Sequence, residues 1–458
     1  MKLKSKDNSQ RVSKLLDSYS DLVIKNNAID PKQYEKYNVK RGLRNANGTG
    51  VLVGLTEIGD VHAYIIDENE KVPVEGRLLY WGIDVMDLVE GFRKEKRHGF
   101  EECAYLLLFG ELPTRQQLED FQKLLSKNRE LPEGFNGDVI PKNPSRDIMN
   151  NLAMGVLACY SFDSNPDDTS VKNVIRQCIA LISRLPTIAA YSYQAMSYKH
   201  KNQSLYIHPP QEELSTAENF LHMIRPDSKY TASEADILDL ALVLHAEHGG
   251  GNNSTFTTHV VSSTGTDTYS AIAAAIGSLK GPRHGGANIK VMGMMEDIKA
   301  NVKDWEDEEE ISAYLRKILS KEAFDRSGLI YGIGHAVYTL SDPRCVLLKR
   351  QAKSLAREKG AEKEYNLYAL IEKLAPQVFC ETKNINKVMC ANVDFYSGFV
   401  YSMLNIPREL YTPLFAISRI TGWCAHRLEE IVQDGKIIRP AYKSVSIRKK
   451  YVPMDERQ

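Results

Sequence analysis

The chain has 458 residues, and its 59 lysine and arginine residues balance its 59 aspartate and glutamate residues. Because this length exceeds the size at which a single hydrophobic core keeps growing, we expect two structural domains. The balanced charge, with no basic block flanked by aromatic side chains, argues against a protein that binds nucleic acid or a membrane surface. It favours small-molecule ligands.

The cysteine residues number seven and include no Cys-x-x-Cys pair. In a chain of this length, this argues against a disulfide framework and a structural zinc site, and it is typical of a reducing compartment. The first ten residues lack the apolar stretch of a secretory signal. No apolar run approaches the roughly 18 residues that a transmembrane helix needs. We therefore expect a soluble protein of the cytoplasm.

The β-strand signals are confined to a region near the amino terminus, between residues 50 and 81. Residues 51–55 and 61–66 are rich in Val, Ile and other strand-forming residues, and residues 67–70 have the polar composition of a turn. Such a pattern is typical of short hairpins. The sequence therefore predicts a small β-hairpin region there.

The rest of the chain carries mostly helical signals. Three capping boxes each precede apolar residues at helical spacing, and they are Thr114-x-x-Gln117, Ser215-x-x-Glu218 and Ser233-x-x-Asp236. Near the carboxyl end, Thr412 and Pro413 predict the start of another helix. The fold class that we predict is mostly α-helical, with the hairpin region as a small addition.

A histidine-rich stretch, residues 244–254, closes a predicted helix and opens into three glycines. His245 and His248 are three residues apart, so a helix would place both on one face, where they could bind a metal ion. The order His-Glu-x-x-His of many zinc enzymes is absent, however. One histidine could instead cap the helix end while the other packs inside. We favour substrate binding over both alternatives, and we expect no metal site.

A Gly-x-Gly pair at Gly332 and Gly334 follows an apolar run and imitates a dinucleotide-binding fingerprint. The third glycine of that fingerprint is missing, because Val337 occupies its place. The phosphate-binding pattern Gly-x-x-x-x-Gly-Lys-Ser/Thr is absent as well. The sequence therefore gives little support to a nucleotide site of either kind.

Three glycine-bearing segments offer a carboxylate and two imidazoles for acid/base chemistry. His284 and His335 are 51 residues apart, and Asp394 follows 59 residues after His335, so only tertiary folding could assemble them into one site. Each could alternatively be a buried histidine or a helix cap. Their shared setting, beside small residues and with little nearby charge, favours catalysis.

Three arginines complete this pattern, namely Arg344, Arg419 and Arg439. They could be ordinary surface residues. A guanidinium is also the group that binds a carboxylate through two parallel hydrogen bonds, so the same residues could hold a dicarboxylate.

Taken together, these segments resemble the citrate synthase family. The resemblance is an ordered series over most of the chain, comprising residues 214–221, 245–254, 281–288, 332–344, 392–398, 418–419 and 439–440. It implies a nearly all-α homodimer whose subunits each have a large and a small helical domain, with the active site between them. It implies a large domain at residues 1–284 and 396–458, and a small domain at residues 285–395.

The resemblance also implies condensation of acetyl-CoA with oxaloacetate, followed by hydrolysis of citryl-CoA. No cofactor is expected, because acetyl-CoA is a substrate. Asp394 would remove a methyl proton from acetyl-CoA while His284 donates a hydrogen bond to the thioester oxygen. Stabilising that developing oxyanion is worth about 3 to 4 kcal/mol per well-placed donor. His335 would polarise and protonate the ketone of oxaloacetate.

The remaining site residues are also carried over from the resemblance. His248, Arg344 and Arg419 would bind oxaloacetate, and Arg439 would reach in from the partner subunit of a homodimer. The CoA contact surface would include Tyr331, Gly332, Gly334 and Lys387. One position departs from the pattern, because the family commonly has an arginine where Trp81 stands.

Three alternatives remain open at the level of sequence. A 2-methylcitrate synthase would use the same residues with propionyl-CoA, and one extra methylene changes binding by only about 1 to 3 kcal/mol. A metal-dependent hydrolase could use the histidine-rich stretch, and it would lose activity in chelator. A non-catalytic ligand-binding relative is the third alternative, and the presence of all the acid/base and arginine residues argues against it.

Overall fold

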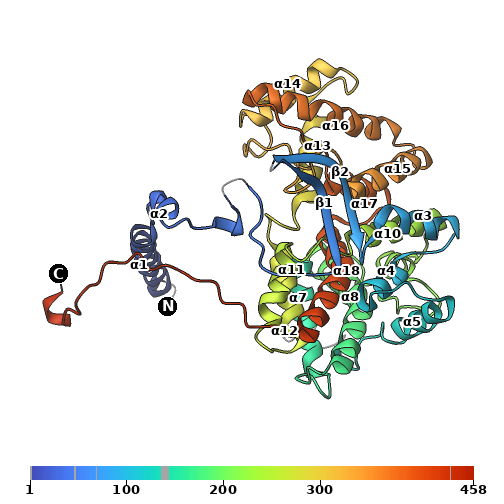
Figure 1. The fold of residues 1–458 in the computed structure, drawn as a ribbon, viewed down its shortest axis with the longest axis horizontal. Helices are drawn as coiled ribbons and strands as arrows, with labels where there is room; N and C mark the ends of the chain where they lie inside the picture. Colours follow the sequence, from blue (N-terminus) through green and yellow to red (C-terminus); the bar gives the residue numbers. More distant parts are fainter. Residues whose placement is uncertain (1–2, 46–47, 69, 136–143, 434, 458) are drawn as a thin grey trace. The chain divides into compact units, whose positions relative to one another are not determined.

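The computed structural model describes residues 3–45, 48–68, 70–135, 144–433 and 435–457 (Figure 1). The chain divides into two compact units, Met1–Leu55 and Thr56–Gln458. The division that we predicted at residues 284/285 and 395/396 concerns the interior of the second unit, and it stays a prediction.

The first unit is helical. It contains α1 (Leu3–Asn27), α2 (Pro31–Lys36) and the short 3-10 helix η1 (Arg41–Leu43). The carboxylate of Asp30 accepts a hydrogen bond from the backbone of Lys32, which fixes the start of α2. Residues 51–55 form no strand, contrary to our prediction. A strand-like composition needs a partner strand to pair with, and Leu52 and Leu55 are instead 84% and 81% exposed.

The second unit begins with a three-stranded antiparallel sheet. Its strands are β1 (Gly59–Asp67), β2 (Glu70–Tyr80) and β3 (Ile83–Asp84), paired in that order. Gly59 pairs with Tyr80, and the register of β1 on β2 shifts between His62 and Tyr64. The predicted β-hairpin region is thus confirmed for this part of the chain.

The rest of the second unit is helical, which confirms the predicted fold class. In chain order the helices are α3 (Val85–Lys94), α4 (Phe100–Phe109), α5 (Arg115–Lys127), α7 (Ile148–Ser161), α8 (Val171–Lys201), α9 (Thr216–Ile224), α10 (Ala232–His245), α11 (Asn253–Ser262), α12 (Thr268–Lys280), α13 (Ala287–Asn301), α14 (Glu308–Leu319), α15 (Pro343–Glu358), α16 (Glu362–Lys383), α17 (Val393–Met403) and α18 (Tyr411–Val432), with 3-10 helices η2 (Arg408–Leu410) and η3 (Met454–Glu456). Within the described ranges, no helix is long and apolar enough to cross a membrane.

The capping boxes test how well local sequence fixes helix ends. Those before α5 and α9 form as predicted, with both reciprocal hydrogen bonds. The third prediction is wrong by two residues, because Thr231 and Glu234 make the box that starts α10. The longer side chain of glutamate reaches back to the capping residue. Ser233 lies inside the helix, and its hydroxyl binds Glu358.

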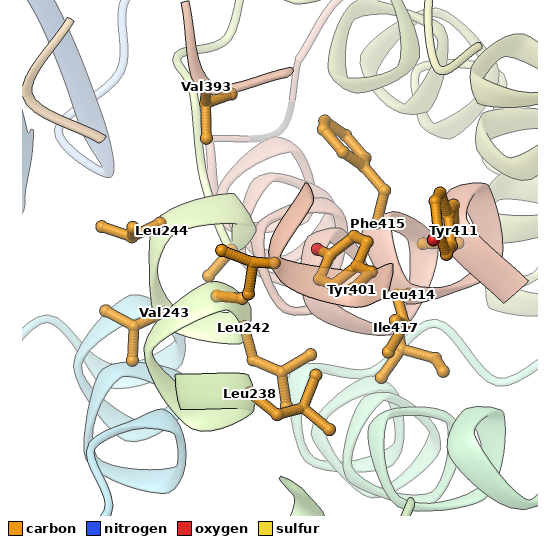
Figure 2. Packing of buried hydrophobic residues seen from close by; sticks show 14 of the residues in the cluster. Leu238, Leu242, Val243, Leu244, Val393, Tyr401, Tyr411, Leu414, Phe415 and Ile417 are labelled. Atoms are coloured by element: carbon orange, nitrogen blue, oxygen red, sulfur yellow. The ribbon is translucent and has the colours of Figure 1, made fainter. Parts of the chain in front are cut away.

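The core of the second unit is built around α18. Residues 411–428 of this helix are all buried, so the helix is covered on every face. The predicted start at Thr412 and Pro413 falls one residue inside the helix, which begins at Tyr411. Figure 2 shows Leu414 and Ile417 of α18 gathered with side chains of α10 and α17. This central helix carries Arg419 into the interior.

Trp81 directly follows β2, at a position where the backbone is left-handed, with a φ of 47°. Its indole nitrogen donates a hydrogen bond to the backbone oxygen of Leu107 in α4, at 3.1 Å. The ring also lies against Gly110, the left-handed residue that ends α4. Trp81 therefore joins the sheet to α4.

Candidate active site

The loop between α10 and α11 presents His248. The turn needs Gly249, whose φ of 79° is a conformation that favours glycine. The buried carboxylate of Glu247 holds the turn, because it accepts hydrogen bonds from the backbone of Gly249 and from His426 of α18. Gly422 of α18 gives that carboxylate room, since a Cβ there would lie 2.2 Å from its Oε2.

Backbone pairing joins the segments that carry His335 and Asp394. The backbone nitrogen of Asn392 donates to the oxygen of Gly332 at 2.9 Å, and the Asn392 side-chain amide donates to the oxygen of Gly334 at 2.8 Å. Asn392 also caps α17, accepting from the backbone of Asp394 at 3.0 Å. Asp394 therefore lies in the first turn of a helix, where the helix dipole favours a carboxylate.

Asp342 anchors Arg344 at the start of α15. Its carboxylate accepts from the Arg344 guanidinium at 3.0 and 2.7 Å, and from the backbone of Val393 at 3.2 Å. Both charged side chains are buried. This contact fixes the guanidinium and at the same time ties α15 to α17, so Arg344 and Asp394 belong to one rigid arrangement.

The hydrogen bonds of His335 define its tautomer. Its Nδ1 accepts from the backbone nitrogens of Val337 and Tyr338, both at 3.1 Å. The neutral ring therefore carries its proton on Nε2, where it can be donated. Burial, and then Arg344, lower the pKa of His335 to about 4, so the ring is neutral at pH 7. The ring stacks on Tyr338, and His248 meets it edge-on with centroids 5.2 Å apart.

His284 is held by a hydroxyl. Its Nε2 lies 3.0 Å from Oγ of Ser254, which also accepts the indole N–H of Trp423 at 3.1 Å. Burial, and then the charge of Arg419, lower the pKa of His284 to about 4. The Ser254 hydroxyl also lies 2.9 Å from Oδ1 of Asn252, so its single proton can go either to that amide oxygen or to Nε2 of His284. When the serine donates to Nε2, the Nδ1 atom of His284 carries the ring proton and can donate it to a ligand.

The carboxyl group of Asp394 is a stronger base than an ordinary aspartate. Burial raises its pKa to about 6, and the negative charge of Asp342 acts in the same direction. Arg344 and Arg419 act in the opposite direction, lowering the pKa. Asp394 is thus mainly ionised at pH 7, yet holds a proton about a hundred times more tightly than a solvated aspartate.

Arg419 is fully buried, and part of its hydrogen-bonding capacity is not used by the protein. Its Nε donates to the backbone oxygen of His245 at 2.6 Å, and the guanidinium lies 4.7 Å from the Phe415 ring centre. Its Nη1 atom and the Nε2 atom of His248 are buried without a hydrogen-bond partner within the described protein. Buried polar atoms are normally paired, so these two are candidates for ligand contact.

The structure brings six predicted residues together, and we call them the site cluster: His248, His284, His335, Arg344, Arg419 and Asp394. The charge of Arg344 acts on the pKa of His248, His335 and Asp394. The charge of Arg419 acts on His248, His284 and Asp394. Two guanidiniums beside neutral imidazoles suit a ligand with two negative charges.

The other predicted residues lie in different surroundings. Gly332 and Gly334 adjoin the site cluster through the pairing with Asn392, and the hydroxyl of Tyr331 donates to Asp325 at 2.8 Å. Lys387 and Arg439 are exposed. Within the described ranges, no hydrogen bond or ion pair joins either side chain to the site cluster.

Sequence reasoning missed three supporting residues. Asp342 had a usable signal, because Asp before Pro is typical of a helix start and places a carboxylate next to Arg344. Ser254 and Trp423 had none, since their contact with His284 joins three distant segments.

The fold is mostly α-helical, and the site cluster has the groups that an enzyme needs for acid/base chemistry on an anionic ligand. The family model described as the C-terminal domain of citrate synthase matches residues 46–441. The citrate synthase of Haloferax volcanii is 34% identical over 92% of this chain and 99% of its own length. The 2-methylcitrate synthase 1 of Corynebacterium glutamicum is 34% identical over 85% of this chain and 94% of its own length.

Solved structures give the same result. The citrate synthase of Thermotoga maritima has a TM-score of 0.71 and 30% identity, covering 92% of this chain and 99% of that chain. The citrate synthase of Thermoplasma acidophilum, solved as a ternary complex with carboxymethyl coenzyme A and oxaloacetate, has a TM-score of 0.74 and 27% identity, covering 92% of this chain and 99% of that chain. The chain belongs to the citrate synthase family, and it is a condensing enzyme of the acyltransferase class.

Proposed function

We propose that this enzyme condenses acetyl-CoA with oxaloacetate and hydrolyses the resulting citryl-CoA to citrate and CoA. The observation that carries the proposal is that Asp394 lies within the electrostatic reach of two buried guanidiniums, those of Arg344 and Arg419, which also act on the neutral imidazoles. Family membership supports the same substrates.

Oxaloacetate would bind through its two carboxylates. Arg344 and the unpartnered Nη1 of Arg419 offer donors for them, and the Nε2 atom of His248 offers a further polar contact. A charged hydrogen bond between guanidinium and carboxylate is roughly twice as strong as a neutral one. The dicarboxylate would also offset the repulsion between two buried cations.

The ketone of oxaloacetate would receive a hydrogen bond from His335. Its Nδ1 is occupied by two backbone donors, so Nε2–H is the end available to the substrate. As the new carbon–carbon bond forms, negative charge develops on the ketone oxygen, and the proton of Nε2 can transfer to it.

Acetyl-CoA would be activated by Asp394 and His284 acting together. A thioester methyl is a very weak carbon acid, so the raised pKa of Asp394, about 6, improves it as a base. His284 would donate from Nδ1 to the thioester oxygen as it becomes enolic, provided that Ser254 donates to Nε2. CoA itself would contact Tyr331, Gly332, Gly334 and Lys387.

Oxaloacetate would also favour closure of the two predicted domains. Arg344 belongs to the predicted small domain and Arg419 to the predicted large domain, so one dicarboxylate held by both would draw them together. Closure would complete the acetyl-CoA site and exclude water from the enol. Acetyl-CoA alone is therefore expected to leave the enzyme open.

The assembly that we propose is a homodimer, with Arg439 entering the partner's site. Exposed apolar residues support it, because Tyr442 and Ile447 near Arg439 are 95% and 83% exposed. Packing against a partner subunit would remove both side chains from water. We further propose a cytoplasmic location, which the free state of all seven cysteines supports.

The proposal is tested by release of the CoA thiol. Release should require oxaloacetate, and Asp394→Asn, which keeps the shape of the side chain, should abolish it. Asp120→Asn, an exposed position on α5, is the matched control and should leave the rate unchanged. Oxaloacetate-independent release by the unaltered enzyme, or full activity of Asp394→Asn, would contradict the mechanism.

The acyl donor is decided in the same assay by comparing acetyl-CoA with propionyl-CoA. The comparison is informative because relatives named citrate synthase and 2-methylcitrate synthase both reach 34% identity. We expect kcat/KM to be higher with acetyl-CoA. A higher kcat/KM with propionyl-CoA would mean that propionyl-CoA is the acyl donor. The proposed roles of the site residues would stay the same.

A further inference from the structure

A second group of titratable side chains lies behind the loop that carries His248. His259 comes from α11, and His426 and Glu429 come from one face of α18. Within the described ranges, this is a group of His, Cys, Asp or Glu side chains whose candidate ligand atoms all lie within 4.8 Å of one another. The proposed reaction does not use any of the three.

The spacing of these atoms suits a tetrahedral cation. The Nε2 atom of His259 lies 3.1 Å from Nδ1 of His426, which lies 3.4 Å from Oε2 of Glu429. Two ligands that are each about 2.0 to 2.1 Å from a tetrahedral metal ion are separated by about 3.3 Å. The Oε2 atom of Glu429 is also buried without a hydrogen-bond partner.

The far nitrogen of each imidazole is held by a carboxylate. Nδ1 of His259 lies 2.8 Å from Oε2 of Glu430, and Nε2 of His426 lies 3.1 Å from Oε1 of Glu247. Each carboxylate accepts the ring N–H and so turns the lone pair of a neutral ring toward the other histidine. Carboxylate–histidine–metal arrangements of this kind orient the ligands of zinc sites.

The two facing lone pairs repel unless a positive charge lies between them. Three carboxylates surround the pair, those of Glu247, Glu429 and Glu430, so the surroundings favour a cation. A proton can supply that charge, and Glu247 and Glu429 do raise the pKa of His426 to about 9. A divalent metal ion would replace this proton and engage all three ligand atoms.

We propose that His259, His426 and Glu429 bind one zinc ion, or another divalent ion that accepts imidazole and carboxylate ligands. Water would complete the tetrahedron from the side of His259, whose side chain is 15% exposed, whereas that of His426 is fully buried. The ion would tie α11 to α18 behind the His248 loop. This differs from our sequence-based expectation of no metal site, for which His245 and His248 were the only histidines considered as ligands.

The test uses the full chain, freed of metal by chelator and titrated with zinc chloride in a calorimeter. We expect one zinc ion per chain and a higher melting temperature with zinc than without. Cobalt(II) in place of zinc should give the strong visible absorption of a tetrahedral site. This test does not depend on enzyme activity, so its failure would leave the proposed reaction standing.

Matched variants make the result specific. His259→Gln should weaken zinc binding more than a hundredfold, and Glu430→Gln, which removes only the carboxylate behind the ligand, tenfold to a hundredfold. His208→Gln, whose ring binds a backbone oxygen elsewhere, should bind zinc as the unaltered chain does. Should His259→Gln misfold, Glu429→Gln keeps the side-chain shape and should show the same loss. Equal binding by the unaltered chain and both ligand variants, or no zinc binding at all, overturns the proposal.

Discussion

Two groups of histidines, the site cluster and the group behind the His248 loop, are held in different electrical surroundings. In the site cluster, burial, and then the charges of Arg419 and Arg344, lower the pKa values of His284 and His335 to about 4. Behind it, His426 faces Glu247 and Glu429, and its pKa rises to about 9. All three rings are largely buried, so burial alone does not decide whether the pKa of a ring rises or falls. The sign of the neighbouring charge sets the protonation state and hence what each histidine can do.

The largest predicted effect is this difference in titration. The sample is the full chain, labelled with nitrogen-15 at its histidines and kept free of metal by chelator. In it we expect the His335 ring to stay neutral down to about pH 4. His426 should stay charged up to about pH 9. Nuclear magnetic resonance of the ring nitrogens measures both, with His335→Gln and His426→Gln to assign the signals. Similar pKa values for the two rings would break the comparison.

Removing a guanidinium from the site cluster should cost stability as well as activity. Arg344→Gln leaves the buried carboxylate of Asp342 without its partner, and breaking such a buried pair typically costs about 3 to 5 kcal/mol. Unfolding in urea measures the loss. The double variant Arg344→Gln with Asp342→Asn, which removes both charges, should recover part of the free energy. A double variant no more stable than Arg344→Gln would show that the uncompensated charge is not the cause.

The pH dependence of the reaction should report the base. Because burial raises the pKa of Asp394 to about 6, the carboxylate gains a proton as the pH falls through that value. We expect kcat/KM to fall about tenfold per pH unit below about pH 6 and to be level above it. Enzyme returned to neutral pH should regain full activity, which separates titration from unfolding. A level profile down to pH 4.5 would contradict Asp394 as the base.

The smallest effect concerns the hydroxyl that holds His284. Ser254→Ala removes the hydroxyl that contacts His284 and also accepts from Trp423. The lost hydrogen bond to His284 is worth about 1 kcal/mol, or roughly fivefold in rate. We expect kcat to fall by about that factor while KM for oxaloacetate stays the same, because Ser254 has no proposed contact with that substrate. Ser254→Thr keeps the hydroxyl and should restore most of the rate. A changed KM with unchanged kcat would indicate a role in binding instead.

How much the sequence predicted depends on how local each feature is. The caps of α5 and α9 were predicted correctly because the cap and its partner are three residues apart. The start of α10 was placed at Ser233 instead of Thr231 because two overlapping boxes competed, and only side-chain length separates them. The helix-rich fold class followed from the same local signals.

The candidate site was predicted from a different kind of information. The family pattern named the residues, while the contacts that gather them lie between distant segments. Asn392 pairs with Gly332 and Gly334, and neither end of that pairing predicts the other. The contact between Glu247 and His426 joins residues 179 positions apart. No local pattern encodes such a pair, which explains why the zinc-binding group was not foreseen.

Arg419 and His426 lie seven residues apart on α18, which is close to two full turns and about 10 Å of helix. The guanidinium of Arg419 and the imidazole of His426 therefore start from nearly the same side of one helix, and the helix fixes their relative position. Inserting or deleting one residue between them would rotate one against the other by about 100°. Evolution can exchange side chains along this stretch, but it has no freedom to change its length.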